Sequence, residues 1–270
     1  MPQEKNKAND VNIAENLNDN DHTVNVSTLA IDAPLQWLRL GWRDLLATRF
    51  RGVFYGIAFA AMGYLITLQY ATKWQLTMGL VSGFFLMGPF VCAGLYGLSR
   101  QLERGEKLSL WRSLTCWSTN PGSIAFFAII LAFLMIVWAR VSVIIFALSS
   151  SHTFPTLQGV LGNIFSLQNP QFVLLWVCVG FVFASIVFAV GVVAVPLMLD
   201  RNSDTMLAMF SSAKALHANP KPLYLWAFLV VLIIGVSLIL NFWPLIITAP
   251  IVGHATWHAY RDLLKNDEQA

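Results

Sequence analysis

Long apolar stretches, separated by short polar ones, dominate the hydrophobic pattern of this chain. They occupy approximately residues 52–70, 75–98, 123–148, 171–199, 223–240 and 242–263. At about 1.5 Å of rise per helical residue, each can cross the roughly 30 Å of hydrocarbon in a bilayer. The pattern therefore predicts an all-α membrane protein with six transmembrane helices. Only residues 241–244 separate the last two stretches, so a re-entrant hairpin is the alternative for that pair.

A short amphipathic segment precedes each odd-numbered stretch, at residues 35–46, 109–117 and 204–214. In the first segment, helical spacing places Leu35 and Trp42 on one side and Asp44 on the other. Ser113 and Ser212 fall on the polar sides of the second and third segments. Helices of this kind lie in the headgroup plane, with aromatic residues at the boundary and basic residues toward anionic lipid. We predict three short interfacial helices.

The chain repeats one order of elements three times: interfacial helix, span, returning span. Several residues of the second unit recur at a constant offset of 99 in the third, namely Trp111, Ser113, Asn120-Pro121 and Phe127 as Phe210, Ser212, Asn219-Pro220 and Trp226. This indicates a threefold helix-hairpin repeat, with coincidence in a biased composition as the alternative.

The positions of Lys and Arg predict the orientation, because short cytoplasmic loops hold an excess of both. All Lys and Arg residues except Lys73 and Arg140 fall on one side when the N-terminus is placed inside. We therefore expect both ends in the cytoplasm. The polar, aromatic-poor residues 1–30 are expected to be a disordered cytoplasmic tail, 31–264 a single integral membrane helical domain, and 265–270 a cytoplasmic C-terminal tail.

Composition excludes several other classes of protein. Hydrophobic residues make up 57% of the 270 residues and charged ones 11%, with a formal net charge of +3. This small charge is spread over several loops, so no nucleic-acid partner is expected. The three cysteines lack a C-x-x-C spacing, and the chain has no phosphate-binding G-x-x-x-x-G-K-[ST] and no H-E-x-x-H. Membrane lipids are the expected partners, with other membrane proteins or self-association as further ones.

Arg140 is the one charge deep inside a predicted span, which makes it a candidate functional residue. It lies past the midpoint of its span, toward the outside, with Trp138 nearby. A guanidinium at that depth can snorkel to the outer headgroups. A packed structural hydrogen bond and a ligand or anion site are the other two interpretations. All acidic residues lie outside the spans, which disfavours proton-coupled transport.

His254 and His258 are the metal candidates, because a spacing of four places both on one helix face. Two ligands do not complete a metal site, and the remaining histidines lie elsewhere in the predicted topology. The other interpretation is an aromatic girdle at the inner interface, formed with Trp257 and Tyr260. No cofactor and no catalytic residue is predicted, although enzymatic activity stays undecided.

Four strings carry a family resemblance: WLRLGWRDLL, GFFLMGPFVCAGLYGLSRQLERGE, PLMLDR and GHATWHAYRDLL. Together they resemble the bacterial integral membrane family called domain of unknown function 2189, over about residues 37–264. The resemblance implies a multi-span bacterial membrane protein without an established activity. Some relatives carry a cytochrome c oxidase label, but a haem-copper catalytic subunit needs more membrane histidines than this chain offers.

The sequence thus predicts a bacterial inner-membrane protein that is non-enzymatic, an accessory, assembly or envelope factor acting through protein or lipid partners. Each returning span carries one interior proline, Pro89, Pro196 or Pro250, which is expected to kink the helix. These kinks and the repeat leave a second function open, that of a facilitator, channel or lipid-handling permease. A respiratory-complex-associated subunit is the third.

Overall fold

The computed structural model describes residues 25–70, 88, 91–149 and 170–264, and this part of the chain is helical without strands. Its helices are α2 (Ala33–Thr48), α3 (Phe50–Tyr70), a helix over 91–103, α5 (Leu110–Leu114), η1 (Cys116–Thr119), α6 (Pro121–Ser149), α8 (Pro170–Gly191), α9 (Ala194–Arg201), α10 (Thr205–Ala218), α11 (Pro220–Ile239) and α12 (Leu245–Leu263).

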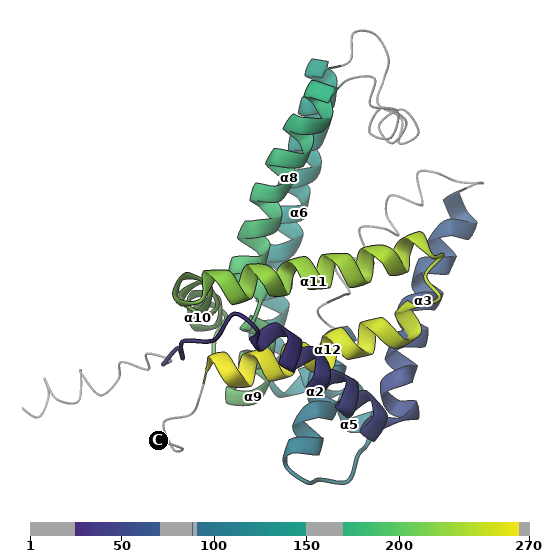
Figure 1. Cartoon of the computed structure of the whole chain (residues 1–270), viewed down its shortest axis with the longest axis vertical. Helices are drawn as coiled ribbons and strands as arrows, with labels where there is room; N and C mark the ends of the chain where they lie inside the picture. Colours follow the sequence, from purple (N-terminus) through teal and green to yellow (C-terminus); the bar gives the residue numbers. More distant parts are fainter. Residues whose placement is uncertain (1–24, 71–87, 89–90, 150–169, 265–270) are drawn as a thin grey trace, which may run out of the picture.

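Helix α12 lies at the centre of the arrangement. It packs along α2 and against α3, and it also contacts α9 and α11. In Figure 1, α6 and α8 stand side by side as a long upright pair, whereas α11 and α12 run across the lower part of that pair. Helix α3 stands on the opposite side of α12 from α9.

Four helices are long and apolar enough to cross a membrane, at Phe50–Leu68, Pro121–Ile145, Pro170–Arg201 and Pro220–Ile239. They correspond to the first, third, fourth and fifth predicted spans. Most of the second predicted span lies outside the described residues, and its end forms the helix over 91–103. The sixth corresponds to α12, which is not among the four.

The surface of the upright pair is the kind that lipid covers. Large apolar side chains on α6 and α8 are more than half exposed, among them Ile129, Phe133, Leu174 and Phe181. An extended apolar surface of this kind is unfavourable in water and natural in hydrocarbon. The membrane class predicted from the sequence is therefore correct.

Glycines allow the central helix to approach its neighbours closely. A Cβ on Gly56 of α3 would overlap the backbone carbonyl of Ile246 in α12, and one on Gly253 would overlap the Leu95 side chain. Small residues at such crossings let two backbones approach and gain dispersion contacts, which is how helices associate in membranes.

The polar sides of the three short helices face the protein, whereas in a water-soluble protein they would face solvent. On α5 and α10, the serines Ser113 and Ser212 are completely buried, while Trp111 and Phe210 are 74% and 72% exposed. The polar side therefore faces the protein and the large apolar side faces outward. On α2, Asp44 on the polar side also faces the protein, because its carboxylate contacts Ser99 and His258.

The helical domain begins before residue 31, where the expected N-terminal tail ends. The backbone N–H of Ser27 donates to the carbonyl of Leu263 at 2.9 Å, and the N–H of Leu29 donates to the Asn219 side chain at 2.7 Å. Residues 27–29 therefore belong to the helical domain, since both of their partners lie in its third unit. Residues 1–24 and 265–270 of the expected tails lie outside the described residues.

Candidate functional site

A buried cluster of polar side chains joins three helices that are distant in sequence. His254 and His258 lie on one face of α12, and Asp44 and Thr48 lie on one face of α2, because each pair is spaced by four residues. The two faces meet, and Ser99 from the helix over 91–103 completes the cluster. His254 is 0% exposed and Ser99 2%.

Hydrogen bonds link these side chains one after another. The Ser99 hydroxyl donates to Oδ2 of Asp44 at 2.6 Å, and Ser99 Oγ lies 2.7 Å from Nδ1 of His254. Nε2 of His258 lies 3.0 Å from the same Asp44 oxygen. We call the four side chains, His254, Ser99, Asp44 and His258, the relay.

The inventory of donors fixes where the protons sit in the relay. A serine hydroxyl has one proton, and a carboxylate only accepts, so the Ser99 proton points to Asp44. Nδ1 of His254 must therefore carry the proton that Ser99 accepts. By the same argument Nε2 of His258 carries the proton that reaches Asp44. Nε2 of His254 then carries no proton, and it lies 3.5 Å from Oγ1 of Thr48, whose hydroxyl donates to the backbone carbonyl of Asp44 at 2.9 Å.

The surroundings of Asp44 favour its charged form. Burial alone raises the pKa of this carboxyl, but hydrogen bonds from His258 and Ser99, together with the charges of both histidines, outweigh burial. The net effect holds the pKa of Asp44 below its ordinary value of 3.8. Asp44 is therefore a carboxylate at neutral pH, bonded by donors from two other helices.

The relay can hold helices together and pass protons over short steps, but it lacks the layout of a nucleophilic site. Ser99 is sealed from solvent and its hydroxyl donates a hydrogen bond to Asp44, so its oxygen faces no space that a substrate could enter. Within the described residues, no group of three or more His, Cys, Asp or Glu side chains is arranged to hold a metal ion. The histidine pair instead bonds to Ser99 and Asp44.

A second polar cluster lies where the returning helices end. The hydroxyl of Tyr260 donates to Asp200 at 2.9 Å, and the indole N–H of Trp257 donates to Glu103 at 3.1 Å. Both aromatic side chains are at most 1% exposed. The interpretation of a girdle facing the headgroups is therefore wrong for these two residues, because carboxylates from neighbouring helices satisfy their polar atoms inside the protein.

Arg140 lies on α6, far along the chain from the relay, and its residue is exposed. The structure therefore does not bring the three candidate residues of the sequence into one site. It joins His254 and His258 through Asp44 and leaves Arg140 on the outside of the upright helix pair.

Apolar helices with lipid-type surfaces and a polar cluster packed around a central helix define an α-helical integral membrane protein. Residues 76–200 match a family model whose description reads "Predicted integral membrane protein (DUF2189)". The match confirms the family resemblance over those residues, a narrower range than the resemblance that the sequence suggested. Neither a curated protein nor a solved structure matches the chain.

Proposed function

We propose that this protein is a non-enzymatic bacterial inner-membrane protein that acts through lipid and protein partners at the cytoplasmic face, as an accessory, assembly or envelope factor. One observation carries the proposal: the short helices α2, α5 and α10 direct large apolar residues outward. Trp42, Trp111 and Phe210 are exposed by 46%, 74% and 72%. Aromatic side chains in such positions anchor a helix at the boundary of the bilayer.

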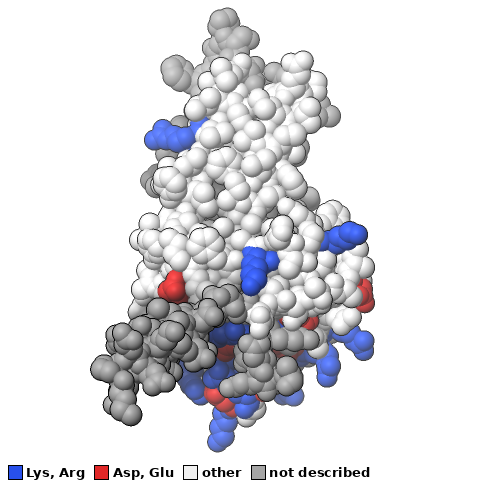
Figure 2. Space-filling view, turned by 90° about the vertical axis from the view of Figure 1, so that its left-hand side faces the viewer, with Lys and Arg blue, Asp and Glu red and all other residues white. Residues whose placement is uncertain are grey.

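Basic residues accompany these anchors. Arg43 follows Trp42 directly, Arg112 follows Trp111, and all of these side chains are exposed. Cationic side chains beside an interfacial aromatic residue attract anionic headgroups, and each such residue contributes about 1 kcal/mol near a charged membrane surface. In Figure 2 most of the visible charged side chains gather at the lower end of the molecule, below a largely uncharged surface.

The proposal includes six crossings, with α12 as the sixth, and both chain ends in the cytoplasm. It also includes the internal threefold repeat. Ser113 donates to the backbone carbonyl of Gly94, and Ser212 accepts from the backbone N–H of Val193 at 3.5 Å, each across 19 residues. The serines and their partners are both related by the offset of 99.

Contacts between the units follow a cyclic order that also favours the repeat. Arg100, near the end of the first unit, donates to the carbonyl of Leu199 in the second at 2.6 Å. Arg201 in the second unit donates to the carbonyl of Leu264 in the third, also at 2.6 Å. Arg261 in the third unit pairs with Glu103 in the first at 2.9 Å. Each returning helix thus uses an arginine to reach the next unit.

The proposed action on lipids is tested by native mass spectrometry of the full chain after gentle detergent extraction. Wild-type protein should retain anionic phospholipid, and Trp111→Ser should lose most of it. Trp243→Ser is the matched control, because Trp243 is 70% exposed but belongs to the turn at the opposite end of α11. Equal lipid retention in wild type and Trp111→Ser would overturn the lipid part of the proposal.

The proposed orientation has its own test in alkaline phosphatase fusions. A fusion after Gly159 should be active, and fusions after Glu106, Ala218 or Asp267 should be inactive. Activity after Asp267 would contradict the sixth crossing.

A facilitator is the second candidate function, favoured by a cavity of about 280 Å³ where the units meet. Its lining comes from the helix over 91–103, α6, α8, α9, α11 and α12, and it includes the polar side chains of Tyr96 and Thr256. Solute flux into proteoliposomes above the protein-free background would favour this candidate over the accessory factor.

A further inference from the structure

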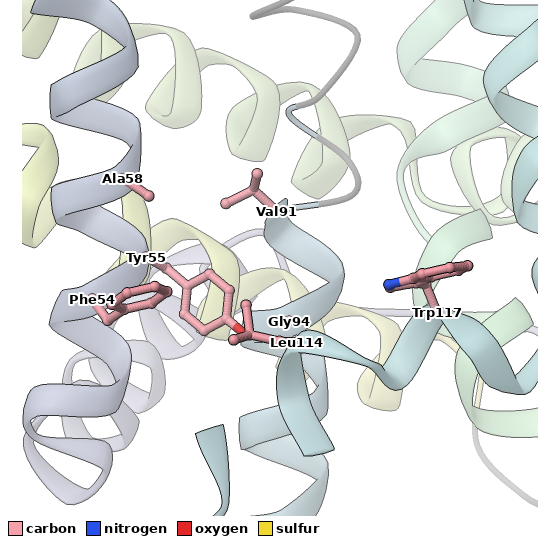
Figure 3. Close-up of a pocket in the computed structure, with 7 residues that line it drawn as sticks. All are labelled: Phe54, Tyr55, Ala58, Val91, Gly94, Leu114 and Trp117. Atoms are coloured by element: carbon pink, nitrogen blue, oxygen red, sulfur yellow. The ribbon is translucent and has the colours of Figure 1, made fainter. Parts of the chain in front are cut away.

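We infer that the acyl chain of a cytoplasmic-leaflet phospholipid occupies the cavity between α3, the helix over 91–103 and α5–η1. This cavity has a volume of about 490 Å³, well within the roughly 300–1,000 Å³ typical of small-molecule sites. The inference deepens the proposed function, on which it rests, by naming the lipid site. Figure 3 shows Phe54 and Ala58 on one wall and Trp117 across the space from them.

The lining calls for hydrocarbon. Its one hydroxyl, on Tyr55, lies 2.6 Å from Oγ of Ser113, and that serine bonds in turn to the carbonyl of Gly94. Because these polar atoms are already satisfied, the indole N–H of Trp117, drawn toward the space in Figure 3, is the polar side-chain group left to meet a ligand, at the wall opposite Phe54. The other walls are formed by apolar side chains such as Phe54, Val91 and Leu114. A cavity of this kind gains most by filling with apolar groups.

The position of the cavity along α3 matches the depth of a lipid chain near its headgroup. The candidate span begins at Phe50, so Phe54 and Ala58 lie about 6 to 12 Å into the span at 1.5 Å per residue. Arg51 lies one turn before Tyr55, at the headgroup end. Trp117 is 47% exposed at the opposite wall and provides the amphipathic ring that favours this boundary.

The membrane itself therefore supplies the occupant. The cavity lies beside a candidate membrane span, where acyl chains are the surrounding medium, whereas a water-soluble ligand would first have to enter the bilayer. The lipid chain would lie against Phe54 and Ala58, with its phosphate near Arg51 and Trp117.

Photolabelling tests this inference on the full-length protein in vesicles of phosphatidylethanolamine and phosphatidylglycerol whose acyl chains carry a diazirine. After irradiation and digestion, mass spectrometry should find labelled lipid on the peptides containing Phe54 to Ala58 and Trp117. Ala58→Trp fills the cavity and should abolish this label. Leu65→Trp, on the same helix at a residue that is 55% exposed, should leave it unchanged. Label of equal strength in wild type and Ala58→Trp would mean lipid at the protein surface only, and would overturn the inference.

A second measurement keeps the test independent of whether Ala58→Trp folds. Benzoylphenylalanine placed at position 117 replaces one large aromatic side chain by another in an otherwise native chain. A crosslink to phospholipid supports the inference. A crosslink to residues 71–87 of the same chain, or to a second copy of the protein, identifies a different occupant and overturns it. If wild-type protein shows no label on these peptides but retains anionic lipid in a manner that depends on Trp111, this inference alone is defeated. If wild type is labelled but its lipid retention does not depend on Trp111, only the proposed lipid anchoring is defeated.

Discussion

Ser99 Oγ and His254 Nδ1 lie 2.7 Å apart in the interior of the protein, although 155 residues separate them in the chain. The bond joins the returning helix of the first unit to that of the third. Because the Ser99 proton points to Asp44, the histidine is the donor here and is held in one tautomer. Both side chains are almost completely sealed from solvent, so neither can recover a lost partner from water.

Ser99→Ala should therefore destabilise the protein. The substitution leaves the buried His254 N–H without a partner and removes one of the two hydrogen bonds to Asp44 Oδ2, which keeps its bond with His258. An unsatisfied buried group costs about 1–3 kcal/mol. The melting temperature in detergent measures the loss. Ser118→Ala is the matched control, because Ser118 is exposed and should tolerate the change. Equal melting temperatures for the two variants would show that the relay does not hold the helices together.

Asp44→Asn should change how stability depends on pH. The pKa of Asp44 is lowered in the folded protein, so its contribution is present above the unfolded value and is lost as pH falls through the folded value. For a carboxyl of this kind the loss begins below about pH 5. The variant should melt lower at neutral pH and fall less steeply on acidification. Parallel melting curves for wild type and variant across the acid range would contradict this role.

Gly56→Ala should weaken the contact between α3 and α12. The added Cβ overlaps the carbonyl of Ile246, and overpacking of this kind typically costs about 1–3 kcal/mol. Gly235→Ala in α11 is the control, because nothing lies within 4 Å of its new Cβ. The control should be neutral or slightly stabilising, since alanine is the better helix former. Thermal stability of both variants in the same detergent distinguishes a packing effect from a general effect of removing glycine.

Two N-terminal truncations that end only six residues apart should have different melting temperatures. Removing residues 1–24 should leave the melting temperature unchanged, whereas removing 1–30 should lower it. The longer deletion takes away Ser27 and Leu29, which bond to the buried Asn219 side chain at 2.8 and 2.7 Å, and leaves that amide only its longer bond to Ala215 at 3.4 Å. Identical melting temperatures would place the whole of 1–30 outside the helical domain, as the sequence alone suggested.

The membrane class could be predicted from the sequence because it follows from local composition. A long helix such as α6 is apolar on every side, and no tertiary contact is needed to recognise it. The burial of Ser113 and Ser212 was harder to predict, because in a water-soluble protein the same pattern would place these serines on the surface. In a membrane the small residues pack against neighbouring helices and the large apolar ones face lipid.

The relay could be predicted only in part. The spacing of His254 and His258 identified them as neighbours, but their partners come from α2 and from the helix over 91–103. Because the sequence shows α2 only as an isolated helix, it predicts that Asp44 lies on the polar side but not which residues it contacts. The one available signal was that Asp44 and Thr48 share a face with the same spacing as the two histidines. Which faces meet depends on tertiary packing, which a single sequence does not encode in any short motif.

Substitutions at Arg140 can show whether this residue snorkels to the headgroups or binds a partner. It lies on the exposed side of α6, where its long stem can carry the guanidinium to the headgroups. Under that reading Arg140→Lys should be nearly neutral, because a lysine keeps both the stem and the charge. Arg140→Leu should insert as well or better, since a charge near the centre of a span carries an insertion penalty of about 2.5–3.5 kcal/mol.

If the guanidinium instead holds a ligand through two parallel hydrogen bonds, an ammonium cannot replace its planar fork, and both variants should lose stability. Membrane yield and melting temperature of the two variants, compared with wild type, distinguish these outcomes. A large loss in both would contradict snorkelling and favour a ligand or a bidentate structural hydrogen bond at Arg140.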